Sequence, residues 1–139
     1  MESHLIYWPL LAQTSIPLGV LILNGTRKAA DVRSGDFDRK QAAMDNEAWG
    51  KPTILTSKNL ANQFQFPVIF YVLCLVLASL NAVSTGVLLA AWLFVLARCV
   101  HAYVHVTTNY VPARLRAFLA SIVALLVLFG MTASALLRT

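Results

Sequence analysis

The 139-residue chain is 58% hydrophobic and 12% charged, about half the charged fraction that is typical of a soluble domain. This composition excludes intrinsic disorder, and two cysteines are too few for a disulfide-rich scaffold. The net charge of +5 does not indicate nucleic-acid binding. Seven of the eleven Lys and Arg residues share residues 27–58 with five of the six acids, and no nucleic-acid-binding motif accompanies them.

Three long runs of the chain contain no Asp, Glu, Lys or Arg. They cover residues 3–26, 59–97 and 117–137 and are 24, 39 and 21 residues long. A bilayer span needs about 20 apolar residues, so the first and third runs each fit one helix and the second fits two. We therefore predict an all-α integral membrane protein, a single domain built as an up-down bundle of four transmembrane helices.

The first helix is expected over residues 5–24, because Gly25 follows it. No Lys or Arg precedes this helix, so we expect it to be retained rather than cleaved as a signal peptide. The polar segment 25–57 is predicted to be a surface loop, within which residues 36–49 could form a short interfacial helix. Three residues in the segment favour a loop over one long helix: Gly35, Gly50 and Pro52.

The second helix is expected over residues 58–79, with Pro67 loosening its start and freeing backbone carbonyls. Residues 81–86, Asn-Ala-Val-Ser-Thr-Gly, have the composition of a turn. Two more helices are then expected, separated by Pro112: residues 87–109 and 115–136.

Four spans place both termini on one side of the membrane. The first loop together with Lys58 at its end holds seven Lys and Arg residues, the third loop holds Arg114 and Arg116, and the other side holds only Arg138. The positive-inside rule therefore predicts that both loops are cytoplasmic and that both termini lie outside the cytoplasm. Topology alone is a sufficient explanation for four of the loop cations: Arg27, Lys28, Arg39 and Lys40.

Polar side chains in the second and third expected helices need a further explanation. Four in the third helix have a spacing of three, four and four, which places them on one face: Arg98, His101, His105 and Asn109. Asn62 and Gln65 likewise share a face of the second helix. Ionisable groups at membrane depth normally face the protein interior or a water-filled cavity, so we expect a shared polar pocket near the cytoplasmic loops.

Two simpler roles remain open for these groups, since they could only join helices through hydrogen bonds, and Arg98 could extend to the lipid headgroups. The nearby cytoplasmic stretch adds Tyr110, Arg114 and Arg116. Residues 59–139 contain four arginines and no acid, which favours an anionic lipid headgroup or an anionic ligand in the pocket.

His101 and His105, four residues apart, have a spacing that is compatible with a metal site. Such a site needs a third ligand, but no Asp or Glu follows Glu47 and Cys99 points to another side of the helix. We therefore predict no metal site.

Two segments resemble a known family. They read Asn-Gln-Phe-Gln-Phe-Pro-Val-Ile-Phe-Tyr at residues 62–71, and Trp-Leu-Phe-Val-Leu-Ala-Arg-Cys-Val-His-Ala-Tyr-Val-His at residues 92–105, with Thr-Asn-Tyr-Val-Pro-Ala-Arg at residues 108–114. The chain is similar in these segments, in length and in span count to the MAPEG family, the membrane-associated proteins in eicosanoid and glutathione metabolism. The resemblance implies a homotrimer of four-helix subunits, with glutathione bound at the subunit interfaces near the cytoplasmic surface.

The resemblance also implies roles for particular residues. The family's Asn-x-x-Glu motif stands here as Asn62-x-x-Gln65, so its carboxylate is lost. The arginine that the family places beside the glutathione sulfur matches Arg114, which is the expected catalytic residue. The remaining expected binding residues are Lys58, Asn62, Gln65, Arg98, His101, His105, Tyr110 and Arg116.

Two functions are compatible with this resemblance. The first is a glutathione-dependent transferase or peroxidase that acts on lipophilic electrophiles, with glutathione as co-substrate and Arg114 stabilising its thiolate. The second is a non-catalytic scaffold that binds lipids or a partner, favoured by Gln65 and by Phe118, which replaces a tyrosine of prostaglandin E synthase. The resemblance to bacterial members leads us to expect the bacterial inner membrane.

Overall fold

The computed structural model describes residues 3–35 and 37–138 of the chain. It is 84% helical, and the described residues contain no strand. Four helical segments are long and apolar enough to cross a membrane: Ser3–Ser34, Lys51–Ser79, Thr85–Val106 and Val111–Leu136. The prediction of an all-α membrane protein with four spans is confirmed.

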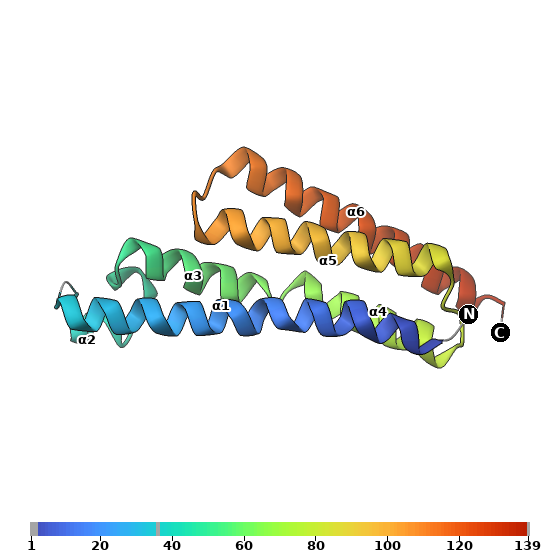
Figure 1. Ribbon diagram of the computed structural model, residues 1–139, viewed down its shortest axis with the longest axis horizontal. Coiled ribbons are helices and arrows are strands. Elements are labelled where there is room, and N and C mark those ends of the chain that lie inside the picture. Colours follow the sequence, from blue (N-terminus) through green and yellow to red (C-terminus); the bar gives the residue numbers. More distant parts are fainter. Residues whose placement is uncertain (1–2, 36, 139) are drawn as a thin grey trace.

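The bundle consists of one very long helix, a broken helix beside it and a helical hairpin. Helix α1 (Tyr7–Ser34) lies along α3 (Lys51–Asn62) and α4 (Phe66–Ser79), which follow one another end to end. The hairpin of α5 (Thr85–Val106) and α6 (Val111–Leu136) packs over them, and both termini lie at the same end of the bundle (Figure 1). The short elements are η1 (Ser3–Ile6), α2 (Arg39–Ala42) and η2 (Asn46–Ala48).

The apolar core lies in the half of the bundle that contains the termini. Phe70 of α4 stacks on Phe94 of α5 with ring centroids 4.4 Å apart, and Leu77 and Leu128 are fully buried beside them. Many other large apolar side chains, such as Leu126 of α6, face outward. An exposed apolar surface of this extent is expected where lipid, not water, surrounds the helices.

Helix α1 ends ten residues later than predicted, at Ser34 rather than at residue 24, and the expected loop of residues 25–57 is largely helical. The helix continues through Gly25 and ends at Gly35, whose left-handed backbone (φ 70°) lets its N–H bond the Asp31 carbonyl. One glycine inside a helix costs only about 1 kcal/mol. Asp31 offsets that cost by accepting from Gly50 N (3.1 Å) and Thr53 Oγ1 (2.6 Å), which fastens the extension to the start of α3.

The second span begins seven residues earlier than predicted and is broken in the middle. Helix α3 starts at Lys51 with Pro52 in its first turn, a position that proline favours. It ends at Asn62, and α4 begins at Phe66 with Pro67 in its first turn. Proline cannot donate a backbone hydrogen bond, so the break agrees with the loosening expected at Pro67. Asn62 and Gln65 therefore do not share one continuous helix face as predicted.

The turn between the third and fourth spans is shorter than predicted. Helix α5 ends at Val106 rather than at residue 109, and α6 begins at Val111 rather than at residue 115. Asn109 has a left-handed backbone (φ 50°), which stops the helix, and Pro112 lies in the first turn of α6, where its missing N–H costs nothing.

Candidate functional site

A buried polar network joins α3 to α5 at the level of the helix break. Asn59 Nδ2 donates to His105 Nδ1 at 3.2 Å, and Gln63 Nε2 donates to Asn59 Oδ1 at 3.2 Å. The three side chains are each 3% exposed or less. Because buried polar groups are stable only when they are hydrogen-bonded, Asn59 fixes the position of His105 through this network.

A second set of contacts holds Arg114 at the start of α6. His101 Nδ1 lies 3.1 Å from the Arg114 carbonyl oxygen, and because a carbonyl only accepts, the proton of this bond is on Nδ1. Arg114 Nη1 donates to Asn109 Oδ1 at 2.7 Å. These contacts tie α6 to α5, and the other N–H donors of Arg114 have no hydrogen-bond partner in the part of the chain that the structure describes.

The two sets of contacts border one pocket between α3, α5 and α6, with a volume of about 490 Å³. Its lining residues are Lys58, Ala61, Asn62, His101, His105, Val111, Arg114, Leu115 and Phe118. Its volume is within the range of small-molecule sites, and such sites combine an apolar wall with a few convergent polar groups. The pocket meets this description, because its lining combines two cationic side chains and two imidazoles with apolar side chains.

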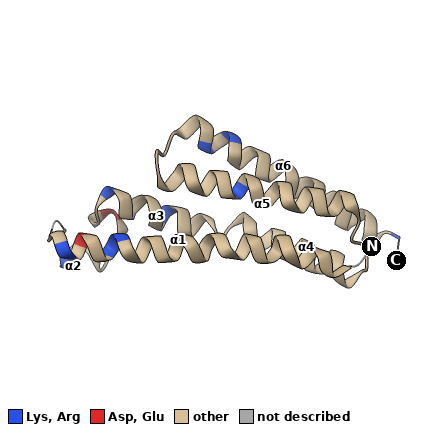
Figure 2. Ribbon diagram, in the orientation of Figure 1, with Lys and Arg blue, Asp and Glu red and all other residues tan. Residues whose placement is uncertain are grey.

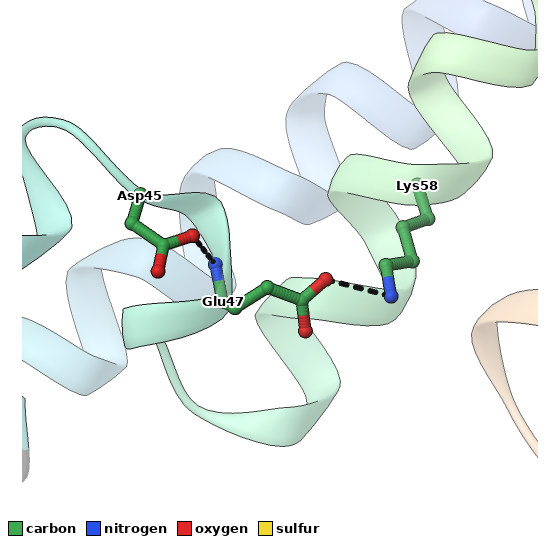
Figure 3. A network of polar contacts seen from close by, with 3 residues as sticks. All are labelled: Asp45, Glu47 and Lys58. Carbon is green, nitrogen blue, oxygen red and sulfur yellow. Dashed lines mark hydrogen bonds and ion pairs between the residues drawn. The ribbon is translucent and has the colours of Figure 1, made fainter.

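One of the pocket cations has a carboxylate partner. Lys58 Nζ lies 2.7 Å from Glu47 Oε1, and the two side chains are 56% and 58% exposed (Figure 3). Glu47 is positioned by its own backbone N–H, which donates to Asp45 Oδ1 at 2.8 Å. An exposed ion pair contributes only about 0.2–1 kcal/mol, so an anionic ligand can displace Glu47 from Lys58 at small cost.

Five of the nine predicted site residues line this pocket: Lys58, Asn62, His101, His105 and Arg114. The other four do not. Arg98 is only 1% exposed and donates from Nη2 to the Asn62 carbonyl at 3.2 Å, so it bridges the break between α3 and α4. Gln65 lies exposed within the break, and Tyr110 and Arg116 are also exposed.

The predicted polar face of the third span is present in part. Arg98, His101 and His105 are all buried on α5. Asn109 lies beyond the end of that helix but contributes through its bond to Arg114.

Sequence reasoning missed Asn59 and Gln63. Asn59 lies three residues before Asn62, and Gln63 directly follows it. The four-residue spacing of Asn59 and Gln63 is one at which helical side chains contact each other, and it could have indicated this pair. Their role becomes clear only from the position of His105, which is 46 residues away from Asn59. Among the described residues, no group of three or more His, Cys, Asp or Glu side chains is placed to hold a metal ion.

Comparison with known proteins identifies the family of the chain. Residues 5–134 match the MAPEG family, while no curated protein and no solved structure gives a significant match. The match covers all or nearly all of each of the four spans and includes every residue that lines the pocket. The chain belongs to the MAPEG family.

Proposed function

We propose that the protein is a glutathione-dependent transferase or peroxidase that acts on lipophilic electrophiles in the membrane. Family membership supports a glutathione-related or eicosanoid-metabolism function in a membrane at the level of the family. The observation that carries the finer proposal is Arg114, which lines the pocket and is held by Asn109 without a carboxylate partner among the described residues.

The chemistry that this arginine would supply is stabilisation of a thiolate. A thiol with an ordinary pKa of about 8.5 is only a few per cent ionised at neutral pH. If the Arg114 guanidinium lowered the pKa of the bound glutathione thiol by about 2 units, the thiolate would dominate. That shift corresponds to about 2.7 kcal/mol of differential interaction, within reach of a charge-assisted hydrogen bond in a pocket of low dielectric constant.

The two reactions use the same thiolate. In the transferase reaction the sulfur lone pair forms a C–S bond to the electrophilic carbon while the leaving group departs with its electron pair. In the peroxidase reaction the thiolate attacks the terminal oxygen of the hydroperoxide and the O–O bond breaks, which gives glutathione sulfenic acid and an alkoxide that takes a proton to become the alcohol. A second glutathione then attacks the sulfenic sulfur, forms the glutathione disulfide and releases the hydroxyl as water. Leu115, Val111 and Phe118 supply an apolar wall against which a lipophilic substrate could lie.

We also propose that the working form is a homotrimer, as is typical of the family. Within one chain, Gln65, Tyr110 and Arg116 are exposed and do not line the pocket. In a trimer with glutathione at the subunit interfaces, exposed side chains of one subunit would complete the pocket of the next.

A second function is favoured by one feature of the pocket. Phe118 contributes a phenyl ring 5.9 Å from the His101 ring and 5.6 Å from Phe66, at a place where a tyrosine could donate a hydrogen bond to a thiolate. A pocket with less donor capacity fits a non-catalytic scaffold that binds a lipid or a protein partner.

The two proposals are separated by measuring glutathione binding and conjugation of an activated aryl halide with the purified protein. Arg114→Ala is expected to lower turnover at least 100-fold, the size of loss seen when one donor to a developing anion is removed. Arg39→Ala is the matched control, because Arg39 is an exposed arginine on α2 that does not line the pocket.

The enzyme proposal fails if the unmodified protein binds glutathione but transfers it to no electrophile and reduces no hydroperoxide. It also fails if Arg114→Ala and Arg39→Ala lower turnover equally. The size of the particles in detergent, measured for both variants, shows whether a loss of activity comes from a loss of assembly.

A further inference from the structure

The pocket between α3, α5 and α6 offers positive charge but no negative charge of its own. Lys58 and Arg114 line it, and none of its lining residues is an acid. The chain has no acid after Glu47, so the α5–α6 hairpin carries basic side chains and no acidic ones (Figure 2). Glutathione is not a simple anion, because one end of the peptide is an α-amino acid with an ammonium and a carboxylate on the same carbon. A site for that end needs an acid as well as a cation.

Among the described residues, one acid contacts a residue that lines the pocket. Asp31 accepts hydrogen bonds from the start of α3, and Asp38 and Asp45 cap α2 and η2. The carboxylate of Glu47 caps no helix, and its Oε1 lies 2.7 Å from Lys58 Nζ. Because Lys58 lines the pocket, Glu47 is the described acid that is placed to meet a ligand there.

The backbone around Glu47 is fixed on both sides. The Glu47 N–H donates to Asp45 Oδ1 at 2.8 Å, and the Gly50 N–H donates to Asp31 Oδ2 at 3.1 Å. Figure 3 shows the Glu47 side chain extending from η2 toward Lys58 on α3. Since the Glu47 side chain is 58% exposed, a ligand at the mouth of the pocket can reach its carboxylate.

The Glu47–Lys58 ion pair is complementary to the two charges of an α-amino acid. When such a ligand binds beside the pair, its carboxylate can pair with Lys58 and its ammonium with Glu47, so one ion pair is replaced by two. Opening the original pair costs little because both side chains are more than half exposed. Glu47 Oε2 has no partner among the described residues, so both carboxylate oxygens can accept from the ammonium.

We propose that Glu47 is a further binding residue that determines specificity for the amino-acid end of glutathione. Its carboxylate accepts from the ammonium of the ligand, while Lys58 pairs with the carboxylate on the same carbon. The site therefore selects thiol peptides with a zwitterionic amino-acid end over peptides that are only anionic. This inference rests on the proposed glutathione function.

The test compares the binding of glutathione and of glutaryl-cysteinylglycine, which lacks the amino group, by calorimetric titration of the full chain in detergent. Glu47→Gln keeps the shape of the side chain and one acceptor oxygen but removes the charge. We expect the unmodified protein to prefer glutathione about ten-fold and Glu47→Gln to prefer it about two-fold, since hydrogen bonds to charged groups are stronger than neutral ones by about this difference.

Asp38→Asn is the matched control. It removes one negative charge from the same segment, and asparagine caps a helix about as well as aspartate does. Asp38 accepts from backbone N–H groups of α2 and contacts no residue that lines the pocket. Asp38→Asn should therefore keep the full preference for glutathione.

A second analogue, 4-aminobutyryl-cysteinylglycine, keeps the ammonium and lacks the carboxylate on the same carbon. Lys58→Gln should lower the preference for glutathione over this analogue, whereas Glu47→Gln should not. If Glu47→Gln lowers the preference over both analogues equally, the substitution disturbs the whole site and the proposal is overturned.

The remaining outcomes separate this inference from the proposed function. If the unmodified protein binds glutathione and glutaryl-cysteinylglycine equally, or if Glu47→Gln and Asp38→Asn behave alike, the inference alone is overturned. It is also overturned if Glu47→Gln binds glutathione more tightly than the unmodified protein, because Glu47 would then only compete for Lys58. If the unmodified protein binds no glutathione, the proposed function fails and this inference fails with it.

Discussion

Replacing Asn59 by leucine removes the centre of the buried network between α3 and α5 while nearly keeping the volume of the side chain. The variant loses the bond to His105 Nδ1 and the bond from Gln63 Nε2, both 3.2 Å long. Gln63 is 2% exposed, and its Oε1 already has no partner among the described residues. The substitution therefore leaves a whole amide and one imidazole nitrogen unpaired in the interior.

The expected cost follows from these two bonds. Hydrogen bonds inside a membrane protein contribute about 0.6 kcal/mol on average and up to about 1.7 kcal/mol each, and stranding a buried polar group costs about 1–3 kcal/mol. We expect Asn59→Leu to lower the free energy of unfolding by about 2–4 kcal/mol. Asn62→Leu is the matched control on the same helix, because the Asn62 side chain is only partly buried and Arg98 contacts its backbone carbonyl instead.

Unfolding driven by a denaturing detergent and followed by circular dichroism measures these differences. Adding Gln63→Leu to Asn59→Leu should recover about 1 kcal/mol, because it removes the stranded amide. The reasoning is refuted if the second substitution destabilises the protein further, or if Asn59→Leu costs no more than Asn62→Leu.

Three further predictions concern other parts of the chain. In the proposed trimer, where Gln65 would complete the pocket of the next subunit, Gln65→Glu is expected to raise glutathione affinity about ten-fold by restoring a carboxylate for the ammonium group. Unchanged affinity in a calorimetric titration would show that the missing carboxylate is not limiting. Arg98→Met should cost no more than about 1 kcal/mol of stability, because Arg98 is a buried cation with no acid beside it among the described residues and an apolar chain of similar length can replace it. Arg98→Ala should cost about 3 kcal/mol or more through the cavity it leaves, and equal losses in detergent-driven unfolding would contradict this account. A C-terminal alkaline phosphatase fusion should be active and a C-terminal green fluorescent protein fusion dark in a bacterial host, as the positive-inside rule predicts, and the reverse pattern would place the termini in the cytoplasm.

Local chemistry made several parts of the structure predictable. The four spans followed from runs without charge, since the bilayer excludes unpaired charges from such lengths of chain. The burial of Arg98, His101 and His105 on α5 followed from their helical spacing, because a polar stripe on a membrane helix turns toward protein. The family followed from the same residues, and the match over residues 5–134 confirms it.

Other features depended on contacts between segments that are distant in the sequence. The end of α1 could not be predicted from Gly25, because the contacts of Asp31 with Gly50 and Thr53 stabilise a helix that local propensity leaves marginal. Similarly, Gln65 has the three-residue spacing from Asn62 that the family motif requires, but the helix break before Pro67 places Gln65 outside the pocket of its own chain.

The sequence by itself determined that this chain crosses the membrane four times and carries arginine and histidine within it, because composition and helical period act over a few turns of chain. Only the tertiary structure decided which of these groups meet. In the folded chain His105 accepts a hydrogen bond from Asn59, and Arg114 lines the pocket. Arg98 does not line the pocket and instead donates to the Asn62 carbonyl. The reason is physical: burial forces each polar group to find a partner, and the partner that it finds depends on which helices pack together.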